Sequence, residues 1–433
     1  MKIVVVCGNW DEEGGRPSKV MEKFIDGMVS TRNMIQAVNG GKYEALKLVQ
    51  EKILPTADAI VWMPQIPNDL PKIRDIKAMY PKKILVTSKA NLLGDYSTQS
   101  IVAHGLALKA NLIIRIDVLS GNQFRCCLLD PLGNSWMHPS YDFKEVGIEV
   151  VSQIKRLRDV TRVPTIRSDD TPIPFPETED SARFLKIVKA KAEIFHGLMG
   201  VGAEVTRFLG NSSFRCMRGF PSMRDNGGAI FVSQRNVDKK FIDKDHFVNV
   251  RLNISTGDVL YYGDNKPSVD TPIQLALYQA LRNVNYMVHS HVYVNEAPFT
   301  RRMIPCGGVE EVTEVMDVIR ARRFQYLRGG FAVNLIGHGS IIFANDVNDL
   351  LSFRFYGRDM PERMYTEPII MEDFEEEEKC FLVQFSNGTE ETLWGVDIDD
   401  ALISNGHDLG VYSQLDWWGE ITDLQEVAEQ DGD

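Results

Sequence analysis

The sequence contains Lys266-Pro267-Ser268-Val269-Asp270-Thr271-Pro272, followed by His289-Ser290-His291 and later by Gly337-His338-Gly339. These stretches supply three imidazoles and one carboxylate, a ligand set that suits a single catalytic Zn²⁺ ion. Apolar runs precede both histidine stretches and predict strands. Because residues two apart on a strand point to the same face, His289 and His291 are expected to bind one ion together, with His338 as a third ligand. The alternative is that each histidine is an ordinary core or surface residue.

The residues around these histidines are similar to a known family. The run from Pro267 to Ala280, PSVDTPIQLALYQA, and the VHSH at 288–291 resemble the class II aldolase/adducin family. The stretches RMIPC at 302–306 and NLIGHG at 334–339 continue the resemblance in the family's order. The likeness covers roughly residues 183–351. An Asp at position 270 makes it closest to the ribulose-phosphate 4-epimerase branch.

The resemblance implies a metal-dependent aldolase or epimerase that acts on a sugar phosphate through a metal-stabilised enediolate. Zn²⁺ or another divalent metal would be the cofactor, and His289, His291 and His338 its ligands. Asp270 would complete the metal shell or transfer protons. An equally open interpretation is that Asp270 caps the helix that follows it.

The resemblance also implies a phosphate site built from three short segments. Gly210-Asn211-Ser212 is similar to the family's Gly-Asn-x-Ser turn, and the loop from Ser233 to Lys239 is similar to its Thr-Pro-Ser-Gly-Val-x-Lys loop. The third segment is the Pro-Ser-x-Asp run that begins at Pro267 and contributes Ser268. Hydroxyls and backbone amides in such loops can hold a dianion. The expected substrate-binding residues are Asn211, Ser212, Ser233, Arg235 and Ser268.

Two of these segments depart from the family's pattern. Asn236 replaces a glycine, which is tolerable because Asn adopts positive φ more readily than most residues. Val269 replaces the usual second serine and removes one hydroxyl. Arg235 would compensate for that loss, unless it is a solvated surface residue.

The family's aldolases carry a tyrosine proton donor after the stretch that matches Ile304-Pro305-Cys306. Here the chain continues Gly307-Gly308-Val309-Glu310-Glu311 without a tyrosine. The family's epimerases place an acidic residue slightly further on, so Glu310 and Glu311 are the candidate catalytic acids, and Glu314 is a further one. The alternative is that these glutamates form a solvated helix face.

Composition limits the classes of function. The 433 residues are 44% hydrophobic and 25% charged, which is ordinary for globular domains and sufficient for two or more. A net charge of -12 without a basic block argues against nucleic-acid binding. Six cysteines without CxxC spacing predict no disulfide framework. The first apolar run, at residues 3–7, is too short for a signal peptide or a membrane span, so a cytoplasmic protein is expected.

The pattern predicts an α/β chain of several parts. Residues 1–162 alternate strands and helices, which resembles a Rossmann or flavodoxin-like domain with a doubly wound, mostly parallel sheet. Residues 163–181 are proline-rich and predict a linker. For residues 182–370 the family resemblance implies an aldolase-like α/β/α domain around a mainly antiparallel sheet. Residues 371–433 form a small acidic extension, with the glutamate run at 375–378 and a hairpin across Ser386-Asn387-Gly388.

Three functions remain open at this point. The first is the sugar-phosphate enzyme, which the resemblance implies to be a homo-oligomer, with a tetramer among the expected states. The second is an adducin-like scaffold that keeps the fold and lacks the chemistry. The third places nucleotide or nucleoside-sugar binding in the first domain, with the aldolase-like part as an assembly module.

Overall fold

The structure is a computed structural model of the chain. It describes residues 1–8, 10, 17–64, 73–92, 96–119, 123–199, 210–216, 229–253, 255–324, 329–364, 379–395, 398, 401–402 and 415–421. The chain forms two compact units, Met1–Tyr365 and Thr366–Asp433, and each is described by itself. The glutamate run at 375–378 lies outside the described residues.

The first sheet of the larger unit is mostly parallel. Its strands are β1 (Lys2–Cys7), β2 (Met34–Asn39), β3 (Ala59–Met63), β4 (Ile84–Leu92), β5 (Leu112–Leu119), β6 (Gln123–Leu129), β7 (Asn134–Ser135) and β18 (Glu362–Arg363). Their order is β18-β7-β6-β5-β4-β3-β1-β2. Strands β1, β2, β3, β4 and β5 run parallel to one another, and β6 is antiparallel to β5. The last strand, β18, comes from far along the chain and pairs in parallel with β7.

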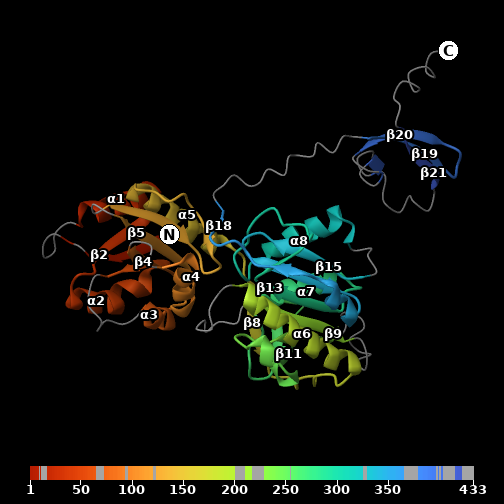
Figure 1. Cartoon of the computed structure of the whole chain (residues 1–433), viewed down its shortest axis with the longest axis horizontal. Coiled ribbons are helices and arrows are strands. Elements are labelled where there is room, and N and C mark those ends of the chain that lie inside the picture. The colour runs from red at the N-terminus through yellow and green to blue at the C-terminus, as the bar shows by residue number, and fades with distance from the viewer. Residues whose placement is uncertain are drawn as a thin grey trace, which may run out of the picture. The chain divides into compact units, whose positions relative to one another are not determined.

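Helices cover both faces of this sheet. They are α1 (Lys19–Ser30), α2 (Tyr43–Leu48), α3 (Ile73–Met79), α4 (Thr98–Ala107) and α5 (Phe143–Asp159), with a π-helical turn at Val49–Ile53 and a 3-10 turn at Leu54–Thr56. The pair α1 and α5 lies on one face, and α2, α3 and α4 lie on the other (Figure 1). Asp142 caps the N-terminus of α5, because its side chain accepts a hydrogen bond from the Lys144 N–H at 2.9 Å.

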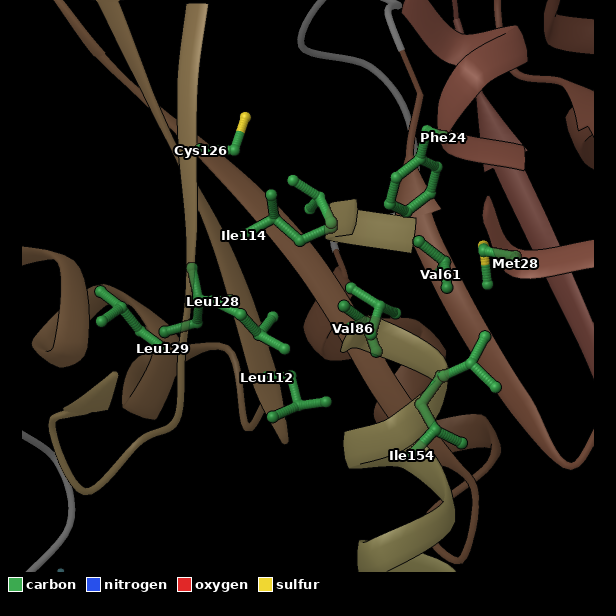
Figure 2. Packing of buried hydrophobic residues seen from close by; sticks show 14 of the residues in the cluster. Phe24, Met28, Val61, Val86, Leu112, Ile114, Cys126, Leu128, Leu129 and Ile154 are labelled. Atoms are coloured by element: carbon green, nitrogen blue, oxygen red, sulfur yellow. The ribbon is translucent and has the colours of Figure 1, made fainter. Parts of the chain in front are cut away.

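The face under α1 and α5 is an apolar core. Phe24 and Met28 of α1 and Ile154 of α5 are at most 2% exposed and belong to one cluster with the sheet residues. Figure 2 shows them gathered with side chains from four strands, among them Val61, Val86, Ile114 and Leu128. Burial of this apolar surface is the main force that holds the two helices on the sheet.

The second sheet is mostly antiparallel. Its strands are β8 (Thr165–Ser168), β9 (Asn211–Cys216), β10 (Ala229–Ser233), β11 (Phe247–Leu252), β12 (Val259–Tyr262), β13 (Tyr286–Ser290), β15 (Phe331–Leu335) and β16 (Gly339–Ala344). Their order is β15-β16-β13-β9-β10-β11-β12-β8, and only β8 pairs in parallel. A separate two-stranded pair joins β14 (Tyr293–Val294) and β17 (Phe355–Tyr356).

Helices again cover both faces of the second sheet. The long helix α6 (Glu179–Leu198) packs Phe184 and Val188 on one face, and α7 (Thr271–Ala280) and α8 (Glu310–Ala321) pack on the other. The described residues of this region also include 3-10 turns at Lys239–Phe241, Lys244–His246 and Val347–Ser352. A capping box between Thr178 and Ser181 fixes the start of α6.

The smaller unit has a three-stranded antiparallel sheet. Its strands are β19 (Lys379–Phe385), β20 (Glu390–Gly395) and β21 (Leu415–Ile421), in the order β20-β19-β21. The predicted hairpin is present: Gly388 has a φ of 81°, and the Asn387 side chain accepts a hydrogen bond from the Thr389 N–H at 2.9 Å.

The predicted fold class is confirmed. The structure has an α/β arrangement with a mostly parallel first sheet, an α/β/α layering around an antiparallel second sheet, and a small β extension. The segment predicted as a linker contributes β8 to the second sheet, while the predicted domain boundaries stay a prediction. None of the helices in the described ranges is both long enough and apolar enough to cross a membrane.

The contact between α1 and α5 depends on two glycines that face the opposite helix. A Cβ at Gly27 would overlap the Lys144 carbonyl oxygen, and a Cβ at Gly147 would overlap that of Phe24. Gly147→Ala is therefore expected to lower the free energy of unfolding by about 1–3 kcal/mol, the scale of overpacking in a core.

Gly197, on the exposed side of α6, is the matched control because a Cβ there meets nothing within 4 Å. Gly197→Ala is expected to stabilise the protein by roughly 0.5–1 kcal/mol. Urea unfolding of the full chain measures both. Equal effects of the two substitutions would show that the helix contact is not tightly packed.

Candidate metal centre

The three predicted metal ligands come together in the second sheet. His289 lies on β13, His291 follows that strand by one residue, and His338 lies in the turn between β15 and β16. One ring nitrogen from each lies within 4.8 Å of the others, and the residues are 4%, 7% and 1% exposed. Among the described residues, this is the only group of histidine, cysteine or carboxylate side chains with metal-binding spacing.

A glycine allows the third ligand to approach the other two. Gly339 directly follows His338 and opens β16 with a φ of 153°, a conformation that other residues rarely adopt. A Cβ at this position would overlap the carbonyl oxygen of Ser290. The absence of a side chain at Gly339 therefore lets the two backbone segments lie close together at the site.

Two of the three rings keep a nitrogen without a hydrogen-bond partner, whereas the Nε2 of His338 lies 3.3 Å from the Cys306 Sγ. The Nδ1 of His289 is 2.9 Å from the Ser340 carbonyl oxygen and donates to it, so Nε2 carries the lone pair. That Nε2 and the Nδ1 of His291 are buried without a hydrogen-bond partner. Buried polar atoms are rarely left unpaired, so these nitrogens fit a site that holds a metal ion.

The pKa values of two rings favour the neutral form that metal binding needs. Burial lowers the pKa of His289 to about 4, and it lowers the pKa of His291 well below the usual value; the nearby His338 adds to both shifts. Neutral imidazole at pH 7 is the form that donates a lone pair to a metal.

Glu311 lies behind the third ligand. It is 3% exposed, and its Oε2 accepts a hydrogen bond from the Nδ1 of His338 at 2.9 Å. Burial alone would lower the pKa of His338, but Cys306 and Glu311 outweigh burial and raise it. A carboxylate in this position fixes the ring and increases its basicity as a ligand. The contacts of Glu311 thus indicate a positioning role, whereas the sequence had suggested a catalytic acid.

The other two glutamates of this helix, Glu310 and Glu314, form hydrogen bonds with residues other than the histidines. The Oε1 of Glu310 accepts a hydrogen bond from the Thr161 N–H at 2.9 Å, and Glu314 binds Arg302 with an Nε to Oε1 distance of 2.6 Å. Glu311 and Glu314 are both at most 5% exposed, so the alternative of a solvated helix face is wrong for these two. The Oε2 of Glu310 is buried without a hydrogen-bond partner in the described part of the chain.

Asp270 lies beside the triad and outside the group of three ligand atoms. It is 8% exposed at the start of α7, yet its side chain makes no capping hydrogen bond. Its Oδ2 accepts a hydrogen bond from the Asn211 Nδ2 at 2.9 Å, and Gln274 binds the Asn211 Oδ1. Its Oδ1 is buried without a partner. One oxygen of the carboxylate is therefore fixed by a hydrogen bond, while the other is buried and can still accept one.

Four of the predicted phosphate-binding residues also come together. Asn211, Ser212, Ser233 and Ser268 are each at most 7% exposed. The Ser233 Oγ accepts a hydrogen bond from the Ser212 N–H at 3.1 Å, and the Ser268 N–H donates to the Ser233 carbonyl oxygen at 3.1 Å. The Ser212 hydroxyl is buried without a partner.

Arg235 is the one predicted substrate-binding residue that is exposed, whereas the other four are buried. Its side chain is exposed, as the surface interpretation expects, and its backbone N–H donates to the Lys266 carbonyl oxygen at 3.0 Å. The next residue, Asn236, has the expected positive φ, 61°.

Lys239 is a site residue that the sequence analysis did not select, although it ends the loop that resembles the family's phosphate loop. It is 9% exposed, and burial lowers its pKa to about 8, against the opposing charges of Asp238 and Asp270. The Val-x-Lys ending of the loop was the available signal.

A second set of unselected residues holds the turn Gly337–His338, here called the metal loop. The Asn134 Nδ2 donates to the Gly337 carbonyl oxygen at 2.7 Å. Arg358 donates to the Asn134 Oδ1 at 2.6 Å and to the His338 carbonyl oxygen at 3.4 Å. Glu362 in turn accepts from Arg358 at 2.8 Å. These partners are far apart in sequence, so no local pattern could have revealed them.

A family comparison matches the part of the chain that contains this site. Residues 203–351 match the family described as Class II Aldolase and Adducin N-terminal domain. This match confirms the predicted resemblance for about a third of the chain, and it covers the triad, Asp270 and the serine loops. None of the curated proteins compared with the chain matches it at a significant level.

Three solved structures are similar to parts of the chain. The DNA/pantothenate metabolism flavoprotein from Streptococcus pneumoniae is 12% identical, covers 36% of this chain and 98% of its own, and has a TM-score of 0.29. YgbL from Klebsiella pneumoniae, described as a candidate aldolase/epimerase/decarboxylase, is 14% identical, covers 40% of this chain and 84% of its own, and has a TM-score of 0.26. The C-terminal domain of the coenzyme A biosynthesis bifunctional protein CoaBC is 13% identical, covers 36% of this chain and 95% of its own, and has a TM-score of 0.27.

The position of Glu311 behind His338 leads to a prediction. Glu311→Gln is expected to weaken the affinity for Zn²⁺ by roughly 10- to 100-fold, the usual effect of losing a carboxylate that orients a metal-bound histidine. Glu314→Gln is the control, since it changes a buried glutamate of the same helix that binds Arg302 instead. Competition with a chromogenic chelator measures both affinities. Equal affinities in the two variants would contradict the positioning role.

Proposed function

We propose that the chain is a divalent-metal enzyme, with Zn²⁺ as the metal, that acts as an aldolase or epimerase on a small sugar phosphate. The observation that carries the proposal is a concentration of unsatisfied buried atoms. Among the described residues, ten buried side-chain atoms have no hydrogen-bond partner. Half of them belong to this one site: His289, His291, Asp270, Ser212 and Gln274.

The donor set fits a metal of this kind. His289, His291 and His338 would hold it, leaving at least one position for substrate oxygens, as is usual in catalytic zinc sites. When bound, the metal would polarise a substrate carbonyl and stabilise negative charge on the adjacent oxygen.

The remaining residues divide between proton transfer and binding. Asp270 has one oxygen fixed by Asn211 and one without a partner, which is the arrangement expected of a group that exchanges a proton with substrate. Ser212 offers a buried hydroxyl, and Lys239 a buried amine near Asp270. Together they suit a phosphate dianion, because its charge would compensate that of the ammonium group.

One observation favours the second candidate, an adducin-like oligomeric scaffold without catalysis. Val269 stands where the family carries a second serine, and it is 41% exposed beside Ser268. An apolar, exposed side chain in that position contributes to a protein contact more readily than to phosphate binding. Homo-oligomerisation belongs to both candidates, and a tetramer remains among the proposed states.

The role of Asp270 separates the enzyme from the scaffold. The purified full chain is expected to hold about one Zn²⁺ per subunit and to convert one of a panel of ketose and aldose phosphates. Asp270→Asn should keep the metal and lower turnover by roughly 100-fold or more, the scale for losing a positioned acid or base. Asp264→Asn is the control, because Asp264 lies on the surface in an ion pair with Arg167.

The outcomes of this experiment are distinct. A chain that binds the metal but converts none of the phosphates fits the scaffold. An Asp270→Asn variant as active as the wild type would remove Asp270 from the mechanism, and loss of metal in His289→Ala would still support the triad.

The lowered pKa of Lys239 predicts a pH dependence. The amine is protonated below its pKa of about 8 and neutral above it, so its attraction for phosphate is lost as the pH rises through that value. We expect kcat/KM for a phosphorylated substrate to fall on the alkaline side of pH 8, mainly through KM. In Lys239→Met this limb should disappear, with a KM that is high at all pH values. An unchanged alkaline limb in the variant would assign it to another group.

A further inference from the structure

A polar pocket of about 240 Å³ lies on the first sheet, and none of its lining residues is a ligand of the metal centre. Most of its lining residues come from four neighbouring strands, β5, β6, β7 and β18. The residues that matter are Arg115, Asp117, Arg125, Cys127, Ser135 and Arg363. This volume is below the range of pockets for drug-sized ligands and suits a small metabolite.

The strand register explains why polar groups gather there. Asp117 pairs with Arg125, and Arg115 pairs with Cys127, so these side chains share one face of the sheet. Their sequence neighbours, among them Ile114, Cys126 and Leu128, belong to the apolar core with α1 and α5 (Figure 2). Since successive residues of a strand alternate between faces, the arginines point to the opposite side from that core.

The pocket has an excess of positive charge. Arg115, Arg125 and Arg363 contribute three positive charges and Asp117 one negative charge, which leaves two positive charges. Burial alone would raise the pKa of Asp117, but hydrogen bonds from Asn91 and Arg115 outweigh it and lower the pKa. The aspartate is therefore ionised at neutral pH. A local excess of two positive charges stands out in a chain whose net charge is -12.

Asp117 already has partners for both of its oxygens. Its Oδ1 accepts from the Asn91 Nδ2 at 2.8 Å and from the Arg115 Nε at 2.7 Å, and its Oδ2 accepts from the Arg125 Nη2 at 3.4 Å. The aspartate thus fixes two guanidinium groups without using all of their donors. The Arg125 Nε is buried and has no partner in the described part of the chain. A buried donor in this state is stabilised when a ligand accepts from it.

The thiol in the pocket is not a competing negative charge. Burial raises the pKa of Cys127 to about 11, so the group is neutral at physiological pH. A neutral thiol is also a poor nucleophile. The polar chemistry of the pocket is therefore that of binding, carried by guanidinium groups.

We propose that this pocket binds a small dianion of the phosphate-monoester class through Arg115, Arg125 and Arg363. The planar guanidinium group offers paired N–H donors that match phosphate oxygens, which a point charge does not. The pocket leaves room for a short organic group beside the phosphate. The site goes beyond the proposed sugar-phosphate chemistry, because none of its lining residues belongs to the metal centre.

The test measures binding of inorganic phosphate and methyl phosphate to the full chain by calorimetry, against sodium chloride of matched ionic strength. The experiments are done in the Lys239→Met background, which removes the phosphate partner proposed at the metal centre. Arg125→Gln is expected to weaken phosphate binding by roughly 10- to 100-fold, the effect of losing charge-assisted hydrogen bonds. Arg167→Gln, which changes an exposed arginine that also binds one aspartate, should leave it unchanged.

A second variant protects the test against misfolding. Arg363→Gln changes an exposed residue at the sheet edge and should show a loss of similar size if Arg125→Gln does not fold. Phosphate binding equal to that of chloride, or equal in the wild type and both arginine variants, would overturn the site. If phosphate binds the otherwise unmodified chain but not the Lys239→Met variant, the pocket is excluded and the proposed function stands. If the arginine variants alone lose binding, the pocket is supported whatever the enzymatic activity.

Discussion

Burial of ring nitrogens without partners is the constraint around which the second sheet is organised. A buried polar group that lacks a hydrogen bond costs about 1–3 kcal/mol. The chain accepts this cost at His289 and His291, while it satisfies the opposite nitrogen of His289 through the Ser340 carbonyl oxygen. Because β13 and β16 are neighbours, their pairing sets that hydrogen bond and with it the tautomer of the ring. The sheet therefore prepares the ligands before any ion is bound.

The charges of the site are balanced only when a cation and an anion are both considered. When the three imidazoles are neutral, as metal binding requires, Asp270 and Glu311 bring two negative charges and Lys239 one positive charge, which gives a sum of -1 for these groups. A divalent ion would change this sum to +1, an electrostatic setting that attracts a phosphate dianion. The lowered pKa of Lys239 agrees with this view, since burial destabilises its charge as long as no anion accompanies it.

The sequence predicted what is local and repetitive in this structure. The apolar alternation identified the strands, and the spacing of His289 and His291 with the glycines around His338 identified the triad. The sequence could not show that Glu311 contacts His338. A glutamate on the buried side of a helix and one on its solvent side look alike in sequence, and only the packing of the helix on the sheet distinguishes them. Asn134 was also out of reach, since its hydrogen bond to Gly337 spans 203 positions and depends on how separate sheets meet. The sequence placed Lys239 at the end of the loop that resembles the family's phosphate loop, but it did not predict that this side chain is buried.

The contact between β7 and β18 joins the metal loop to the arginine pocket. In this short parallel pair, Asn134 lies opposite Glu362 and Ser135 lies opposite Arg363. Asn134 and Glu362 hold Gly337, whereas Ser135 and Arg363 line the pocket. Alternate residues of a strand point to opposite faces, so the same two strands present one pair to each site. The pairing cannot shift without moving both pairs, because a change of register exchanges the faces. The β7–β18 pair is thus a structural element that the metal loop and the pocket have in common, and it explains why the chain returns from the second sheet to complete the first.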